Sequence, residues 1–297
     1  MTQPYRRHVP VLFEVAIDFL QVRRGGIYVD CTLGLGGHAE GIVRRLGPTG
    51  RLIGLDRDAE ALALARERLD GVRRELGGEA PEVTLVGEAF SSIAQHVAAG
   101  TADGLLADFG VSSMQFDEAR RGFSFQADGP LDMRMDTRTG LTAYQVVNEA
   151  SERELADLIY EYGEERRSRT VARAIVRGRP VTSTGQLARI VASAVPPMKH
   201  LHPATRTFQA LRIYVNRELD EIRALFEAAP QLLKPSGRLV VISFHSLEDR
   251  IAKDSLRDGA QQGIWKVLTR KPVTADDAEI ERNPRSRSAK LRAAQRQ

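Results

Sequence analysis

The spacing of the strand-like segments constrains the fold of this chain more than any other feature of its sequence. Four short apolar runs, each bounded by turn residues, are typical of buried parallel strands, and they lie at residues 27–31, 51–56, 83–86 and 104–108. A fifth run, at residues 237–244, follows only after a segment that is far too long for one crossover in a compact sheet. The sequence therefore predicts an α/β sheet domain that a second domain interrupts.

The interrupting segment has the periodicity of helices. From about Leu141 to His202, apolar residues recur at helical spacing and no strand-like run occurs. Ser151 and Ser183 are each followed three residues later by Glu or Gln, which is the spacing of a capping box and predicts two helix starts. The inserted domain is therefore expected to be all-helical.

These segments define the expected domain boundaries. Residues 1–138 and 207–297 are assigned to the interrupted sheet domain, and residues 139–206 to the inserted helical domain. A single helix from about Phe208 to Leu233 is expected to lead back into the fifth strand. The second part of the sheet domain ends in a basic tail from Asn283 to Gln297.

The composition excludes several classes of protein. The single cysteine, Cys31, cannot form an internal disulfide or the usual thiolate zinc site, so no metal is expected. No apolar run is long enough to span a bilayer, and the N-terminus lacks a signal peptide, which favours a cytoplasmic protein without membrane contact. Lys and Arg number 43 against 39 acidic residues, an excess that permits nucleic-acid binding without requiring it.

The first strand runs into a glycine-rich turn. Gly34, Gly36 and Ala39 match the dinucleotide-binding fingerprint, at the sheet edge where doubly wound folds bind ligands. Asp56 ends the second strand, where such folds carry a ribose-binding carboxylate. The glycine pattern alone also fits a tight turn without a ligand, but the second feature favours a nucleotide cofactor.

Asp30 distinguishes between the nucleotide cofactors. A carboxylate at the mouth of the glycine loop would repel a pyrophosphate, whereas it would attract the ammonium and sulfonium groups of S-adenosylmethionine. The alternative role of Asp30, a helix cap or turn acid, carries less weight because Asp56 and Asp108 also end strands at this edge. Phe90, after the third strand, fits an adenine contact and a core aromatic equally well.

Longer strings extend the pattern over nearly the whole chain. They are HVPVL (8–12), GLGGH (34–38), DFGVSS (108–113), RGFSF (121–125), PLDMRMD (130–136), TFQALRI (207–213), VISFHSLEDR (241–250) and NPRSRS (283–288). In sequence and order they resemble the ribosomal RNA small subunit methyltransferase H family, which methylates N4 of a cytosine in 16S ribosomal RNA. The resemblance implies a Rossmann-like S-adenosylmethionine-dependent methyltransferase sheet domain with an inserted all-helical domain.

The resemblance also implies cofactor contacts and a substrate. The implied contacts to S-adenosylmethionine are Gly36, Gly37, His38, Asp56, Phe90, Asp108 and Gln115. All of these except Gln115 lie on or beside features that the sequence itself singles out, and Asp30 and Gly34 complete the expected cofactor site. The implied substrate is a cytidine in the decoding region of 16S ribosomal RNA in the assembled small subunit. The sequence leaves open whether the protein is a homodimer.

The expected catalytic residues are Asp108 and Ser112. Methyl transfer needs proximity and alignment more than a strong base, and Asp108 is expected to accept a hydrogen bond from the cytosine amine with Ser112 assisting. The alternative, almost equally weighted, is that Asp108 only positions the cofactor. Phe109, Phe123 and Phe125 are candidates to stack on a base turned out of the RNA, although a core role is somewhat more common for each.

Two basic segments are candidates to bind RNA phosphates. Arginines recur at helical spacing at positions 166, 169, 173 and 177, although such a stripe is more often a solvated helix face. The tail is the stronger candidate, and its predicted RNA-binding residues are Arg285, Arg287, Lys290 and Arg292.

Three alternative functions are kept. A NAD-dependent oxidoreductase is disfavoured by Asp30 and by the lack of a second nucleotide-binding half. A non-catalytic RNA-binding assembly factor on a methyltransferase fold is disfavoured because the glycine loop and the strand-end acids are intact. Methylation of DNA or of a small amine is opposed only by the family resemblance.

Overall fold

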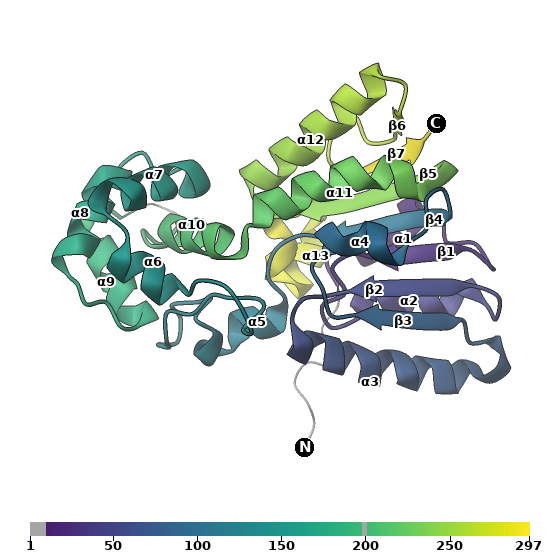
Figure 1. Cartoon of the computed structure of the whole chain (residues 1–297), viewed down its shortest axis with the longest axis horizontal. Helices are drawn as coiled ribbons and strands as arrows, with labels where there is room; N and C mark the ends of the chain where they lie inside the picture. The colour runs from purple at the N-terminus through teal and green to yellow at the C-terminus, as the bar shows by residue number, and fades with distance from the viewer. Residues whose placement is uncertain (1–9, 198–200) are drawn as a thin grey trace. The chain divides into compact units, whose positions relative to one another are not determined.

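The chain forms two compact units (Figure 1). The computed structural model describes residues 10–197 and 201–297. The first unit, here called the sheet unit, comprises the chain up to Gly110 together with Leu219–Gln297. The second, the helical unit, comprises Val111–Glu218.

The sheet unit is built on a seven-stranded sheet in the order β3-β2-β1-β4-β5-β7-β6. The strands are β1 (Ile27–Asp30), β2 (Arg51–Leu55), β3 (Glu82–Val86), β4 (Ala102–Asp108), β5 (Leu233–Ser243), β6 (Trp265–Val267) and β7 (Lys290–Arg296). The strands β1 to β5 are mutually parallel, whereas β7 runs antiparallel to both β5 and β6. The five parallel strands confirm the α/β class that the sequence predicts.

Helices cover both faces of this sheet (Figure 1). On one face, α1 (Phe13–Leu20), α2 (Gly37–Leu46) and α3 (Ala59–Leu76) share one apolar cluster with the strands. On the other face lie α4 (Ile93–His96) and α11 (Glu218–Leu232). The sheet unit also contains α12 (Ser246–Gln261) and α13 (Asp277–Arg282). The helices cover the faces of the sheet, so a ligand-binding site is expected at the ends of the strands.

The segment expected to be a basic tail contains a strand of the sheet. Residues 290–296 form β7, inside the sheet between β5 and β6. Leu291, Ala293 and Ala294 are buried in the core. The sequence pattern hides this strand because its core positions are mostly small Ala residues, which are depleted in strands, and because charged residues flank them.

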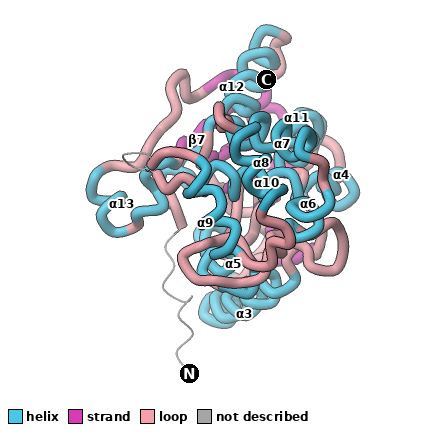
Figure 2. The backbone as a smooth tube through the Cα atoms, turned by 90° about the vertical axis from the view of Figure 1, so that its left-hand side faces the viewer, coloured by secondary structure: helices cyan, strands magenta, loops and turns pink. Residues whose placement is uncertain are grey.

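The helical unit contains only helices and loops among its described residues (Figure 2). Its helices are α5 (Ser113–Asp117), α6 (Ala143–Glu149), α7 (Glu152–Gly163), α8 (Ser168–Arg177), α9 (Thr184–Ala194) and α10 (Thr205–Asn216). The expected capping box of Ser151 with Glu154 is present at α7. Ser183 accepts the Gln186 N–H at α9, but the Gln186 side chain turns to Thr182, so only half of the second expected box forms.

The unit boundaries differ from those expected from the sequence. Residues 111–138 belong to the helical unit, because Phe123, Leu131, Met133 and Met135 are buried in the same apolar cluster as its helices. Residues 207–218 belong to it as well, as part of α10 and its end. The sequence gap located the insertion but not the chain segments that pack onto it.

The single helix expected from Phe208 to Leu233 is wrong. The structure ends α10 at Asn216, and Arg217 takes a left-handed conformation with φ of 51°. The Asn216 amide donates to the Met133 carbonyl at 2.7 Å, and its oxygen accepts the Met135 N–H at 2.8 Å. These bonds fix the helix end, and helical periodicity alone carries no signal of them. No helix among the described residues is long and apolar enough to cross a membrane.

Candidate active site

The strand order places the candidate site at one edge of the sheet. The order reverses between β1 and β4, and ligands of open α/β sheets bind outside the carboxyl ends of the strands at such a point. Asp30 and Asp108 are the last residues of β1 and β4, and Asp56 directly follows β2. The parallel pairing therefore brings the three acids to the same edge, as the sequence predicts.

The glycine loop is held by its backbone conformation and by a carboxylate. Gly34 and Gly36 have φ of 50° and 75°, a region that favours glycine. The Gly34 N–H donates to Asp56 Oδ2 at 2.8 Å, which ties the loop to the end of β2. A Cβ on Gly37 would lie 2.3 Å from Pro10 Cγ, so the start of α2 has no room for a side chain.

Asp30 and Asp56 are carboxyls whose negative charge is poorly compensated. Asp30 is buried and accepts the Thr32 N–H at 3.2 Å, and burial raises its pKa to about 7. Asp56 accepts the N–H groups of Gly34 and Asp58, yet burial raises its pKa to about 6. Within residues 10–197 and 201–297, neither forms an ion pair with Lys or Arg. Such an edge attracts a cation and repels a phosphate.

Asp108 has an unused carboxyl oxygen. Its Oδ2 lies 3.9 Å from His38 Nδ1, while its Oδ1 is buried without a hydrogen-bond partner in the described part of the chain. His38 Nε2 donates to the Val11 carbonyl at 3.1 Å, so the neutral imidazole presents its unprotonated Nδ1 to Asp108. Burial, and then the charges of Asp30 and Glu248, raise the pKa of Asp108 well above its usual value.

The aromatic residues near this edge differ in burial. Phe90 follows β3 and is half-buried, and its ring lies 6.2 Å from that of Phe109. Phe109 is buried in the core, so the suggestion that it stacks on a base is not supported. Phe90 keeps the cofactor contact expected of it as a prediction.

Ser112 and Gln115 belong to the helical unit. They form the capping box of α5, in which the Ser112 hydroxyl accepts the Gln115 N–H and Gln115 Oε1 accepts the Ser112 N–H. Gln115 is buried. Both side chains thus have a local structural role, and the catalytic role of Ser112 and the cofactor contact of Gln115 stay predictions.

Two of the predicted RNA-binding residues are buried, and a contact of either with RNA stays a prediction. Phe123 is buried in the apolar core of the helical unit. Arg292 is only 6% exposed, because β7 directs it onto Asp249, with Nε 2.7 Å from Oδ1. Lys290 is half-buried and lies 3.4 Å from the same carboxylate.

The remaining RNA candidates have mixed surroundings. Phe125 is partly buried and packs against His202 and Phe208. Arg285 and Arg287 are exposed in the segment before β7. On α8, the side chains of Arg169, Arg173 and Arg177 are exposed, and Arg173 pairs with Glu152 at 3.3 Å. The exposed arginines stay candidates for phosphate contacts.

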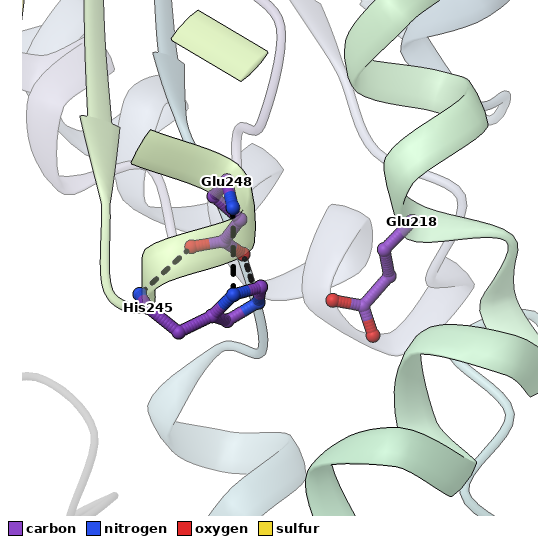
Figure 3. A group of neighbouring side chains, drawn as sticks. All are labelled: Glu218, His245 and Glu248. Carbon is purple, nitrogen blue, oxygen red and sulfur yellow. Dashed lines mark hydrogen bonds and ion pairs between the residues drawn. The ribbon is translucent and has the colours of Figure 1, made fainter. Parts of the chain in front are cut away.

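Sequence reasoning missed two residues beside this edge. His245 and Glu248 follow β5 and form a capping box at the start of α12 (Figure 3). Both are almost completely enclosed, with side chains 10% and 0% exposed. Figure 3 also draws Glu218, a residue of the helical unit that Arg212 binds through two hydrogen bonds. The sequence gives only a weak local signal for them, since histidine is not a preferred N-cap residue, and their position beside β4 follows from the strand order.

The fold and the edge together define a class of enzyme. A parallel sheet with its order reversed between β1 and β4, and with an antiparallel β7 beside β5, is the arrangement of S-adenosylmethionine-dependent methyltransferases. Asp30 and Asp56, whose pKa values are raised and which have no ion-pair partner among the described Lys and Arg residues, fit the ammonium and sulfonium of that cofactor and would oppose a pyrophosphate. The chain is therefore a methyltransferase that uses S-adenosylmethionine.

Comparison with known proteins gives the family. The chain belongs to the MraW methylase family, which matches residues 5–297. It is 67% identical to ribosomal RNA small subunit methyltransferase H of Acidobacterium capsulatum, with 98% of each chain covered. It is 60% identical to the protein of the same name from Koribacter versatilis, over 97% of this chain and 94% of that one. A putative rRNA-methylase structure from Clostridium thermocellum aligns over 98% of this chain and all of the other, with 11% identity and a TM-score of 0.49.

Proposed function

We propose that this enzyme methylates N4 of a cytidine in the decoding region of 16S ribosomal RNA, within the assembled small subunit. Methylation of small-subunit ribosomal RNA is supported by the names of relatives that cover nearly the whole chain. The observation that carries the chemistry is the buried, unpartnered Oδ1 of Asp108 at the end of β4, beside the glycine loop.

An exocyclic amine is the acceptor that this oxygen fits. The lone pair of a cytosine amine is delocalised into the ring, so the amine attacks well only when it is held and oriented. A carboxylate oxygen that accepts one amine N–H favours that geometry and offsets the positive charge that develops on nitrogen. When bound, S-adenosylmethionine supplies a methyl group already activated by the sulfonium.

The proton that N4 loses on methylation needs an acceptor, and we assign this second role to Asp108. Transfer of the methyl group from bound S-adenosylmethionine would form the bond from the methyl carbon to N4 as the bond from that carbon to sulfur breaks, and N4 would have to lose one proton. Asp108, at the end of β4, has a buried acceptor atom without a hydrogen-bond partner in the described part of the chain. In its ionised form this carboxylate is a stronger base than an ordinary one, because burial and neighbouring acids raise its pKa, so it can take up the proton that N4 loses.

Binding of RNA is assigned to the exposed arginines. Arg285 and Arg287 lie exposed next to β7, and Arg169 and Arg177 lie exposed on α8. Contacts of this kind position the RNA without reading its sequence. The base itself must be turned out of the folded RNA to reach a half-buried carboxyl at the end of a core strand such as Asp108.

The test is methyl transfer to small subunits that lack the modification. Labelled S-adenosylmethionine is incubated with assembled subunits or with naked 16S ribosomal RNA, and the digested nucleosides are identified by mass spectrometry. Label in N4-methylcytidine, and only with assembled subunits, is expected. Label in another nucleoside would contradict the N4 assignment, and transfer to naked RNA alone would contradict the assembled subunit as substrate. Cofactor binding without methyl transfer would favour a non-catalytic assembly factor.

A further inference from the structure

His245 caps α12 with a side chain that is larger than capping requires. β5 ends at Ser243 and α12 begins at Ser246, and His245 Nδ1 accepts the Glu248 N–H at 3.4 Å. Ser, Thr, Asp and Asn are the preferred N-caps and would accept the same bond with a smaller side chain. The cap therefore does not explain why an imidazole stands here.

The other ring nitrogen of His245 has no hydrogen-bond partner. A neutral imidazole that accepts at Nδ1 carries its hydrogen on Nε2, which makes Nε2 a donor. Nε2 is buried and unbonded within residues 10–197 and 201–297. Glu248 Oε1 lies 3.0 Å from Nε2, an ion-pair distance that Figure 3 marks, but the two atoms do not form a hydrogen bond. A buried N–H without a partner is unfavourable in a finished fold, so this one points to a ligand.

This unused donor lies beside the unused acceptor of the active site. β4 and β5 are parallel neighbours, and Asp108 pairs in register with Ile242, three residues before His245. A Cβ on Gly110 would lie 3.9 Å from Glu248 Oε1, so the chain after Asp108 passes along the His245 cap. Glu248 is also one of the charges that raise the pKa of Asp108.

We propose that His245 reads the target base by donating its Nε2–H to ring nitrogen N3, while Asp108 Oδ1 accepts from the neighbouring amine. Cytosine presents an amine donor at N4 and an acceptor at N3 side by side, which complements one acceptor and one donor on the protein. Uracil presents the opposite order at these two positions. His245 is thus a specificity-determining residue of the proposed reaction, and the inference rests on that proposed function.

The test removes the donor from the protein and the acceptor from the base, singly and together. His245→Ser keeps a hydroxyl that can cap α12, and subunits reconstituted with 3-deazacytidine at the target replace N3 by a C–H group. Each change alone is expected to lower kcat/KM about 10- to 100-fold, as for a buried hydrogen bond left unpaired. Both together are expected to cost little more than either one, because they remove the same bond.

Controls separate this role from a structural one. His245→Asn, which keeps a preferred N-cap, repeats the test if the serine variant melts early, and His96→Ser removes an imidazole that pairs with Glu88 on the surface after β3. S-adenosylmethionine affinity should be unchanged in both His245 variants. Wild-type kcat/KM in a folded His245 variant, or losses that multiply with 3-deazacytidine, would overturn the inference. Failure of the wild-type protein to methylate the natural cytidine would instead overturn the proposed function, and the inference with it.

Discussion

Two groups of shielded carboxylates in the sheet unit have opposite surroundings. At the β1/β4 edge, burial raises the pKa values of Asp30 and Asp108, and no Lys or Arg of the described residues pairs with either. Beside β7, burial acts on Asp249 in the same direction, but hydrogen bonds from Arg292 and Lys290 prevail and hold its pKa below the usual value. Because the fold pairs the half-buried Asp249 with cations and leaves Asp30 and Asp108 without them, the two unpaired acids are candidates for a binding site.

The largest expected effect comes from the unpaired group. Asp108→Asn keeps the size of the side chain but replaces a charged acceptor by a neutral one, so turnover is expected to fall about a thousandfold, as for other groups that stabilise developing charge. Single-turnover methyl transfer and equilibrium titration with S-adenosylmethionine measure the two roles separately. Unchanged turnover would refute the catalytic role, and a loss of cofactor affinity of the same size would favour the alternative that Asp108 positions the cofactor.

Loss of the ion pair between Arg292 and Asp249 is expected to lower the stability of the fold. Arg292→Met leaves Asp249 with only the longer contact to Lys290, and the free energy of unfolding is expected to fall by about 2 kcal/mol, the value of a hydrogen bond to a charged group. Urea unfolding measures it. The matched control is Arg287→Met, an exposed arginine in the preceding segment, for which a change within about 0.5 kcal/mol is expected. Reduced cofactor affinity in Arg292→Met with unchanged stability would contradict the structural role of the Arg292–Asp249 pair.

The backbone of the glycine loop sharpens the comparison. Gly36→Ala places a Cβ at φ of 75° and 3.4 Å from Ala65 Cβ, which should cost about 1–2 kcal/mol of stability. It should also weaken cofactor binding, because the loop moves. Gly263→Ala is the control, since Gly263 has φ of 72° with open space around it. Equal cofactor affinity in the two variants, measured by titration calorimetry, would argue against the loop as the cofactor cradle.

The smallest effect is expected at the exposed arginines. Replacing Arg285 and Arg287 by Ala should reduce the slope of log affinity for RNA against log salt by about 0.7 for each phosphate that the variant no longer binds. Filter binding over a range of salt concentrations measures the slope. Replacing Arg66 and Arg74, two exposed arginines of α3, changes the net charge equally and serves as the control. The same reduction in both pairs would reflect net charge and not a local interaction with RNA.

The sequence predicted the elements whose signals are local. The five parallel strands, the interruption and the strand-end acids follow from apolar runs and turn residues, and all are observed. The sequence did not predict β7, because Ala293 and Ala294 do not form a strand-like apolar pattern and Arg292 made the segment resemble a basic tail. The sequence did not predict the helix break at Arg217. The break depends on the Asn216 side chain, which bonds the backbone of Met133 and Met135, and these residues are distant in sequence.

The site was predictable only in part for the same reason. Asp30, Asp56 and the glycines have a motif, whereas His245 and Glu248 matter through their position beside β4, which sequence spacing cannot supply. The burial of Phe123 likewise depends on packing across the helical unit. Roles that depend on which strands are neighbours need the sheet order.

The measurement that tests the central claim most directly is proton release when S-adenosylmethionine binds. Asp30 and Asp56, with pKa values raised to about 7 and about 6, hold protons near pH 6 that a cationic ligand should displace. Calorimetry in buffers of different ionisation enthalpy is expected to show proton release near pH 6 and an affinity that rises with pH and levels off above about pH 7, both weakened in Asp30→Asn. Binding without proton release and with no dependence on pH would contradict the assignment of the unpaired acids to the cofactor.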